Sequence, residues 1–292
     1  MKLENFTRED QREIAFITVN YCSANATALL LGDLLEQQLS SLTLTIVVAD
    51  NSPSGSDLDA LRIALAEHKE VRFLRMPSNL GYLGAAQIAL NTYWKDRFPD
   101  WVIVSNPDIR LPQRDFLERI ATATTSSAVI APRIISTRTG LDQNPFHRAR
   151  PSKFRMQLNR AIPRVPVLFQ MMEWQCAIKN KVRSRLRRSE PASATDPEAI
   201  YAPHGAFLIF SRKYFERGGS LNVGAFLFAE EKFVAETCRM LGLGVFYDPS
   251  FEIHHDEHVA TSHSSAVRHF QISAADYIYR EFFTRTGPQV KC

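Results

Sequence analysis

The stretch that decides the fold is Leu44-Thr-Ile-Val-Val-Ala-Asp-Asn51, a nearly continuous apolar run that ends in an acid and an amide. Three more runs have the same form, and they are Ile14–Tyr21, Val71–Met76 and Trp101–Ser105. Continuous apolar runs are typical of strands that are covered on both faces. Helical patterns separate the runs, near residues 26–39, 57–68 and 83–97. This alternation predicts an α/β fold with a mostly parallel central sheet flanked by helices.

The composition of the 292-residue chain is that of a globular protein, with 45% hydrophobic and 23% charged residues. No apolar run approaches the roughly 18 residues of a membrane span. The opening residues are polar and lack the apolar core of a signal peptide. Four scattered cysteines form no CxxC pair, so we expect a reduced, cytoplasmic protein without disulfides or a thiolate zinc site.

The strand–helix alternation is interrupted between residues 140 and 198. Before that segment we expect a helix near 112–124 and a strand near 128–135. After it we expect a strand over Ile200–Phe210, a helix near 229–241, a strand over Gly244–Tyr247 and a last helix near 264–284. The segment 140–198 is rich in proline and is predicted to be an insertion with one helix, near 166–188, whose apolar side carries Leu168, Met172, Ile178, Val182 and Leu186.

The insertion is also strongly basic, because residues 147–190 hold twelve Lys or Arg but only Glu173 and Glu190 as acids. A local patch on an otherwise acidic chain, without a known reader motif, argues against a nucleic-acid partner. Basic amphipathic helices bind anionic lipid, so an anionic membrane surface is an expected partner. A solvated surface helix remains the alternative.

Polar side chains follow each of the four apolar runs where the strand ends. They are Asn20-Tyr21, Asp50-Asn51-Ser52, Ser78-Asn79-Leu80-Gly81 and Ser105-Asn106-Pro107-Asp108. Parallel strands bring these ends to one edge of the sheet, where open α/β sheets bind ligands. Asp50 suits hydrogen bonds from a base or ribose, and Asp108 suits a Mg²⁺ or Mn²⁺ ion on phosphates. Ordinary turn chemistry is the alternative for any single residue.

The segment Asn79-Leu-Gly-Tyr-Leu-Gly84 precedes a predicted helix, but it has neither a dinucleotide fingerprint nor a P-loop. Gly84 at the helix start would let the backbone approach a ligand closely.

Glu230 and Glu231 open the helix near 229–241 and flank its inward stripe of Val234, Cys238 and Leu241, with Lys232, Glu236 and Arg239 predicted on the opposite side. A carboxylate in a first helical turn is held ionised by the helix dipole and suits a general base. Glutamates that only stabilise the helix are the alternative.

The sequence His254-His-Asp-Glu-His258 is not the HExxH motif of zinc proteases. One histidine would complete a metal site begun by Asp108. Neighbours on an extended chain face opposite ways, so His254 and His255 do not both do so. A surface cluster is the alternative.

The order of these motifs resembles family 2 glycosyltransferases with the GT-A fold, especially the rhamnosyltransferase-like bacterial branch that builds surface polysaccharides such as the O-antigen of lipopolysaccharide. The resemblance spans about residues 14–260. It rests on these segments: Ile17-Thr-Val-Asn-Tyr21, Val47-Val-Ala-Asp-Asn-Ser52, Asn79-Leu-Gly-Tyr-Leu-Gly84, Val104-Ser-Asn-Pro-Asp108, Gly205-Ala-Phe207, Phe226-Leu-Phe-Ala-Glu-Glu231, Tyr247-Asp-Pro249 and His255.

The resemblance implies a role for each matching residue. The base and ribose would be lined by Thr18, Asn20 and Asp50, beside Tyr21 and Asn51. The nucleotide and donor sugar would lie against Asn79, Gly81 and Gly84. Asn106-Pro107-Asp108 would replace the family's Asp-x-Asp, with Asp108 and His255 near the metal. Glu231 would be the catalytic base, with Glu230 as its rival, and Gly205 and Ala206 would face the acceptor.

Three departures from the family pattern are Asn106 for the first aspartate, Glu231 for the catalytic aspartate, and Gly218-Gly-Ser-Leu-Asn222 for Gly-Gly-Phe-Asp. The chain would be a single catalytic domain over 1–292. Its nucleotide-sugar half would span 14–139, the basic insertion 140–198, the acceptor and catalytic half 199–260, and a C-terminal helix 261–292.

The expected activity is transfer of rhamnose or another hexose from a nucleoside-diphosphate sugar to a glycan or lipid-linked acceptor, with inversion, at the inner face of the cytoplasmic membrane. A non-catalytic nucleotide-sugar or glycan binder of the same fold is one alternative. A sugar nucleotidylyltransferase is another, although residues 20–23 lack the Gly-rich loop with Arg that this class carries after its first strand.

Overall fold

The computed structural model describes residues 12–40, 42–123, 127–171, 174, 175, 178, 196–257 and 265–284. In the first half, strands and helices alternate as β1 Arg12–Asn20, α1 Ala24–Leu35, β2 Leu42–Asp50, α2 Ser56–Ala64, β3 Val71–Arg75, α3 Tyr82–Tyr93, β4 Trp101–Ser105, β5 Ile109–Arg110, α4 Phe116–Thr122 and β6 Val129–Ser136. The four strands and three helices predicted from the opening runs are confirmed within a few residues.

The second half begins in the insertion and returns to the sheet. Its elements are α5 Lys153–Ala161, the 3₁₀ turn η1 Ile162–Arg164, β7 Glu198–Ile200, β8 Phe207–Ser211, α7 Arg212–Glu216, α8 Glu230–Met240, β9 Val245–His255, α9 Ser265–Tyr279 and the π-helical turn η2 Arg280–Thr284. Among the described residues, no helix is long and apolar enough to cross a membrane.

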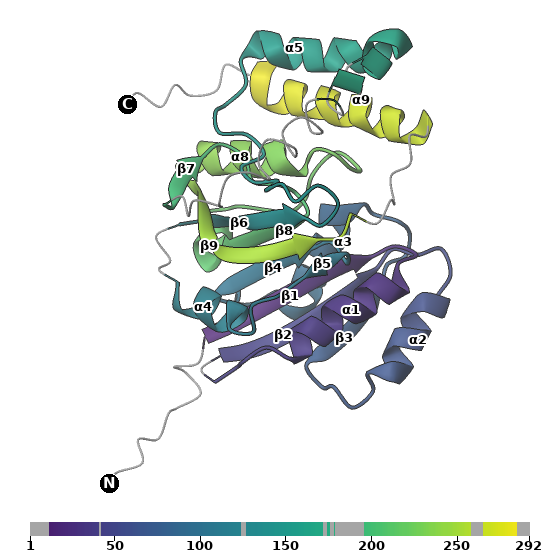
Figure 1. Ribbon diagram of the computed structural model, residues 1–292, viewed down its shortest axis with the longest axis vertical. Helices are drawn as coiled ribbons and strands as arrows, with labels where there is room; N and C mark the ends of the chain where they lie inside the picture. Colours follow the sequence, from purple (N-terminus) through teal and green to yellow (C-terminus); the bar gives the residue numbers. More distant parts are fainter. Residues whose placement is uncertain are drawn as a thin grey trace.

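One nine-stranded sheet runs through the protein in the order β3-β2-β1-β4-β8-β6-β9-β5, with β7 paired to β9 (Figure 1). The first four strands in that order are parallel to one another, as predicted. Beyond them β8 runs antiparallel to both β4 and β6, while β6 and β9 are parallel. The sheet is therefore parallel from β3 to β4 and mixed from β8 to β5.

Two apolar layers cover the two faces of the sheet, and the alternation along β1 shows how they are divided. Ile17 and Val19 point to the layer that contains α3, α8 and α9, whereas Ile14 and Phe16 point to the layer that contains α1, α2 and α4. Leu34 of α1 is fully buried in the second layer, so we expect its truncation to alanine to cost about 2–5 kcal/mol.

Four details of the second half differ from the sequence prediction. The strand expected over Ile200–Phe210 is two strands, because a turn at residues 203–206 separates β7 from β8. The strand expected over Gly244–Tyr247 continues to His255, with a bulge opposite Pro132 and Arg133. Glu236, predicted to face outward, is fully buried.

The fourth difference lies in the insertion, where α5 was not predicted. Residues 166–171, 174, 175 and 178 are helical, in agreement with the start of the helix expected over 166–188, and Met172, Val182 and Leu186 lie outside the described residues. Figure 1 shows α5 stacked on α9. Asp276 of α9 pairs with Arg160 at 2.7 Å and with Arg164 at 2.6 Å, so ion pairs hold the insertion on the last helix.

Candidate active site

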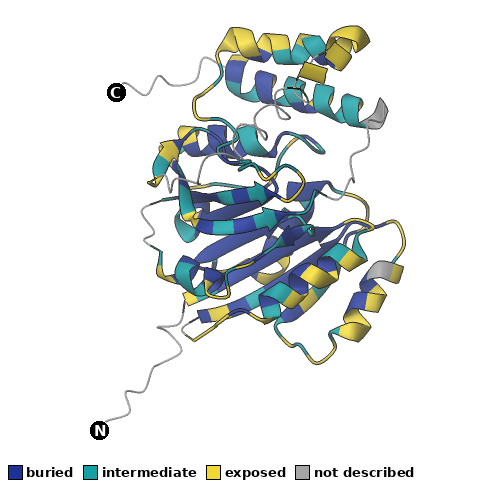
Figure 2. Ribbon diagram, in the orientation of Figure 1, coloured by how far each residue is buried: buried dark blue, intermediate teal, exposed yellow. Residues whose placement is uncertain are grey.

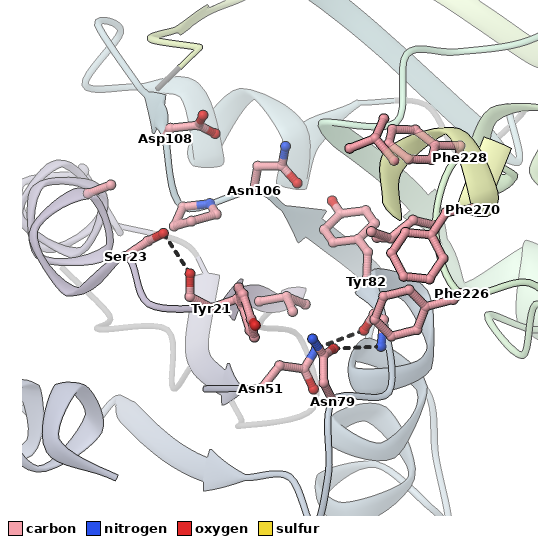
Figure 3. A pocket seen from close by; sticks show the side chains of 16 residues that line it. Tyr21, Ser23, Asn51, Asn79, Tyr82, Asn106, Asp108, Phe226, Phe228 and Phe270 are labelled. Carbon is pink, nitrogen blue, oxygen red and sulfur yellow. Dashed lines mark hydrogen bonds between the residues drawn. The ribbon is translucent and has the colours of Figure 1, made fainter. Parts of the chain in front are cut away.

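A cavity of about 460 Å³ opens at the carboxyl ends of β1, β2 and β4 (Figure 3). Its walls are formed by Val19, Tyr21, Ser23, Ala26, Asn51, Asn79, Gly81, Tyr82, Asn106, Pro107, Asp108, Phe226, Leu227, Phe228, Val267 and Phe270. Six residues chosen from the sequence lie in this wall, namely Tyr21, Asn51, Asn79, Gly81, Asn106 and Asp108. The polar strand ends thus meet at one edge of the sheet, as the parallel topology requires.

The opposite wall of the cavity is apolar, and sequence reasoning assigned no role to it. Figure 3 shows Asn106 and Asp108 on one side and Phe226, Phe228 and Phe270 on the other. The rings of Phe226 and Phe270 are 4.8 Å apart between centroids. The apolar run Phe226-Leu-Phe228, one residue before the two glutamates, was a sequence signal for part of this wall. Phe270 comes from α9, and nothing in its local sequence predicts that it packs there.

The loop at residues 79–81 is fixed by the end of β2. The side-chain amide of Asn51 donates to the carbonyl oxygen of Gly81 at 2.9 Å and accepts from the backbone N–H of Leu80 at 3.2 Å. Gly81 has φ of 75°, and a Cβ there would lie 2.1 Å from the carbonyl oxygen of Phe226. Only glycine therefore lets this loop close against the aromatic wall.

Thr18, Asn20 and Asp50 do not line the cavity, because strand alternation turns them to the face that α1 covers. Asn20 donates to Asp50 Oδ1 at 2.7 Å and accepts from Thr27 of α1 at 2.9 Å. The Ser52 hydroxyl also donates to Asp50 Oδ1, at 2.6 Å. Two buried atoms of this cluster, Thr18 Oγ1 and Asp50 Oδ2, have no hydrogen-bond partner. The cluster ties the end of β1 to the end of β2.

His255 is oriented toward Asp108 by a chain of side chains. The side-chain N–H of Gln143 donates to Glu257 Oε1. This bond turns the Gln143 amide oxygen toward His255, and the oxygen lies 2.8 Å from His255 Nδ1. An amide oxygen only accepts, so Nδ1 carries a proton, and the neutral form of this ring has its lone pair on Nε2. That Nε2 atom is 3.4 Å from Asp108 Oδ1. A hydrogen bond from the second ring nitrogen is how proteins orient metal-binding histidines.

These residues fit a divalent cation. Asp108 Oδ1 is buried and has no hydrogen-bond partner among the described residues, and His255 Nε2 lies 3.4 Å from it. Among the described residues, no group of three or more His, Cys, Asp or Glu gathers as a complete protein cage. Mg²⁺ is ordinarily held by one or two carboxylates together with substrate phosphates, and this pair of ligands matches that requirement.

Glu230 and Glu231 lie near the same point, at the start of α8. Burial raises the pKa of the Tyr82 hydroxyl well above its usual value, and the charges of Glu230, Asp108 and Glu231 raise it further. Tyr82 lines the cavity, so three carboxylates from two parts of the chain, the Asp108 strand end and the start of α8, act on one cavity residue. The helix start and the Asp108 strand end therefore face a shared space.

The two glutamates differ in their surroundings. Glu230 is buried, and its carboxylate accepts backbone N–H groups of residues 228–230; burial and then the charge of Glu231 raise its pKa to about 8. Glu231 is less buried, and its Oε1 lies 3.0 Å from where a Cβ on Gly205 would be. Gly205 thus leaves room for the Glu231 carboxylate.

The remaining predicted residues are placed as follows. The carbonyl oxygen of Ala206 accepts the backbone N–H of Asn106 at 2.8 Å, so Ala206 lies directly behind the part of the wall that Asn106 forms. Gly84 is in the first turn of α3 and does not line the cavity. His254 faces away from Asp108 and contacts Glu252, as the alternation predicted. His258 lies outside the described residues.

One histidine near the site had no predicted role. The His204 ring is 6.0 Å from that of His255 between centroids, and its Nδ1 accepts the backbone N–H of Ala206 at 3.2 Å. Burial first, and the nearby His255 second, lower the pKa of His204 to about 4. His204 is therefore a neutral N–H donor at physiological pH.

Comparison with known proteins places the fold. No family model and no curated protein sequence matches this chain. A mannosyltransferase from Pyrobaculum calidifontis, solved in complex with GDP-Man and Mn²⁺, superposes with a TM-score of 0.55 and 17% identity over 93% of this chain and 65% of its own. GalNAc-T7, solved with UDP, GalNAc and Mn²⁺, gives a TM-score of 0.54 and 12% identity over 85% of this chain and 44% of its own.

The fold is therefore the GT-A fold of nucleotide-sugar glycosyltransferases, as the sequence resemblance implied. This chain spans less than two thirds of the length of either neighbour.

Proposed function

We propose that the protein is a metal-dependent glycosyltransferase that moves a hexose from a nucleoside-diphosphate sugar to an acceptor hydroxyl, with inversion. The observation that carries the proposal is the convergence of Asp108, Glu230 and Glu231 around Tyr82, at the edge of a cavity in a GT-A fold. In both solved neighbours a nucleotide or nucleotide sugar is present together with Mn²⁺, which supports the same type of donor here.

Asp108 and His255 would hold Mg²⁺ or Mn²⁺ against the donor diphosphate, where the ion supplies Lewis-acid stabilisation of the leaving group. Tyr21, Asn51 and Asn79 line the part of the cavity that we assign to the nucleoside. Asp50 precedes Asn51 of that wall, and its buried Oδ2 has no hydrogen-bond partner among the described residues.

Glu231 would act as the general base, because Glu230 already uses its carboxylate on the backbone N–H groups of residues 228–230. Glu231 takes the proton of the acceptor hydroxyl while the acceptor oxygen bonds to the anomeric carbon. The bond from that carbon to the diphosphate oxygen breaks in the same step, so the centre is inverted and no covalent enzyme intermediate forms.

The finer assignment follows the sequence resemblance. We propose a bacterial enzyme of surface-polysaccharide synthesis with rhamnose or another hexose as the transferred sugar, and a glycan or lipid-linked acceptor. The apolar wall of Phe226, Phe228 and Phe270 gives the cavity a surface suited to the less polar faces of a sugar ring or acceptor.

The test uses the full chain with Mn²⁺ and a panel of UDP-, GDP- and dTDP-sugars, and measures release of nucleoside diphosphate with glycan and lipid-linked acceptors. We expect turnover with one donor. Glu231→Gln should reduce it by about 10²–10⁴-fold and leave nucleotide binding intact. Glu67→Gln, at an exposed position, is the matched control. Full transfer by Glu231→Gln would remove Glu231 from the role, and binding without turnover would favour the non-catalytic alternative.

A further inference from the structure

Exposed apolar side chains are concentrated in one short part of the insertion. Of the fifteen large hydrophobic residues that are exposed among the described residues, eight fall between Phe154 and Ile178. Scattered surface hydrophobics are normal, but a concentration of this kind marks an interaction surface. Figure 2 shows the outer side of α5 as exposed, in contrast to the buried sheet.

The exposed residues of 166–178 follow a helical repeat. Val167, Met171, Trp174 and Ile178 are separated by four, three and four residues, which places them along one side of a helix. Their exposed fractions are 64%, 52%, 69% and 43%. Phe169 of the same helix is 8% exposed and faces the protein. The helix is thus seated on the fold by Phe169 and presents a second apolar stripe outward.

The sequence around this stripe is mostly basic, with Glu173 as the one acid of residues 148–188. Arg160 and Arg164 are paired with Asp276, Arg148 with Glu198, and Arg150 with Glu236. Among the described residues, Lys153 and Arg155 have no ion-pair partner. The stretch that follows the stripe, residues 179–188, contains six Lys or Arg and no acid.

We propose that the stripe of Val167, Met171, Trp174 and Ile178 docks the protein on an anionic lipid bilayer, which the basic composition of the neighbouring sequence favours. Apolar residues with a Trp on one side and Lys and Arg beside them are the composition of helices that lie in the membrane interface.

The docking surface is connected to the cavity through α9. Arg268 donates to the carbonyl oxygens of Pro163 and Arg164, directly before the exposed helix. Its neighbours Val267 and Phe270 line the cavity. A bilayer bound at the stripe would therefore lie one helix layer away from the site. The bilayer is a partner in addition to the donor and acceptor of the proposed function, and vesicle binding is measured without turnover.

The experiment measures binding of the full chain to vesicles of phosphatidylcholine alone and of phosphatidylcholine mixed with phosphatidylglycerol. Trp174 reports insertion, because Trp94 and Trp101, the other two tryptophans, are 7% and 0% exposed. We expect salt-sensitive binding to the anionic vesicles, and quenching of Trp emission by brominated lipid that Trp174→Phe removes. The triple variant Val167→Ser, Met171→Ser, Trp174→Ser should bind at least about tenfold more weakly.

The matched control is Ile63→Ser with Met240→Ser, which removes two exposed hydrophobics elsewhere and should bind like the wild type. Circular dichroism of each variant shows that folding is unchanged. The proposal is overturned if brominated lipid does not quench Trp174, or if the triple and control variants bind anionic vesicles equally. A wild-type dimer that the triple variant converts to a monomer, without any vesicle binding, would assign the stripe to a second copy of the chain instead.

Discussion

His255 Nε2 lies 3.4 Å from Asp108 Oδ1, and the register of β5 against β9 sets this distance. Ile109, the residue after Asp108, is the register partner of His255, and the backbone N–H of Asp256 donates to the Asp108 carbonyl oxygen at 2.9 Å. The two side chains are therefore held together by strand pairing before any ligand binds. Such preorganisation is what a cation site of few protein ligands requires.

Gln143→Leu tests whether the hydrogen bond at His255 Nδ1 affects the affinity for Mn²⁺. Without the Gln143 oxygen, the imidazole loses the partner that fixes its tautomer, and we expect the affinity for Mn²⁺ to fall by about 10–100-fold. Titration of Mn²⁺ followed by electron paramagnetic resonance measures this, in the presence of nucleoside diphosphate. The control is Gln113→Leu, whose amide bonds the backbone of β9 at Glu252 and Ser250, away from Asp108. Equal losses in both variants would contradict a specific role for Gln143.

Gly81→Ala and Gly84→Ala form a matched pair at the start of α3. At Gly81 an added Cβ would lie 2.1 Å from Phe226 O in a backbone with positive φ, so we expect a loss of about 1–3 kcal/mol or more and a weaker nucleotide site. At Gly84 the nearest atom is 3.4 Å away inside α3, so alanine should stabilise the helix by roughly 0.5–1 kcal/mol. Urea unfolding separates the two results.

The Gly84 variant also tests the donor-side role that the sequence resemblance implies. A protein that is more stable but binds nucleotide sugar less tightly would support a close approach of the donor to Gly84. Unchanged binding would leave Gly84 with no part in the site, in keeping with its absence from the cavity wall.

Glu230→Gln should change how stability depends on pH. The pKa of Glu230 is raised by burial from 4.5 to about 8 in the folded protein. As the pH rises between these values, the unfolded chain releases this proton and the folded chain keeps it. The free energy of unfolding of the wild type therefore falls with rising pH, and the glutamine variant lacks this decrease.

The measurement is the melting temperature of both proteins across that pH range without added metal. We expect Glu230→Gln to gain on the wild type steadily from pH 4.5 to about 8. Glu67→Gln, at an exposed position, should track the wild type throughout. A constant difference between Glu230→Gln and the wild type would show that Glu230 titrates normally.

The sequence predicted the structure most accurately where a single local rule determines an element. Trp101–Ser105 is a strand with the predicted bounds, because an unbroken apolar run between polar residues permits little else. The polar strand ends follow from parallel pairing alone. Parallel pairing alone misplaced Thr18 and Asp50. Alternation along the strand decides which face of the sheet a side chain takes, and a continuous apolar run does not show which face borders the cavity.

The parts that were missed depend on packing between distant segments. Phe270 and Val267 reach the cavity only because α9 packs beside the loop at 226–228. Gln143 stands in a loop with no motif, and its role appears only once β9 places His255 beside it. Glu236 fits the outer side of α8 by helical spacing, yet the insertion covers that side with Arg150.

That coverage leads to the last prediction, which concerns how α8, the helix that carries Glu230 and Glu231, is held. Glu236 is fully buried and accepts from Arg150 Nε at 2.6 Å, from the Tyr201 hydroxyl at 2.7 Å and from Arg239 Nε at 2.8 Å. It follows Glu230 and Glu231 on α8, so the insertion anchors the helix that carries the proposed base. Glu236→Gln keeps the shape but removes the charge that balances two guanidinium groups.

Breaking a buried ion pair costs about 3–5 kcal/mol, but both arginines are partly exposed and can regain water, so we expect roughly 1–3 kcal/mol for Glu236→Gln. Tyr201→Phe should cost about 1 kcal/mol, because it removes a single hydrogen bond. The double variant should lose less than the sum of the two, since both act on one carboxylate. Urea unfolding of all four proteins completes the cycle. Strict additivity would mean that the Tyr201 hydroxyl and the Glu236 carboxylate do not interact in solution.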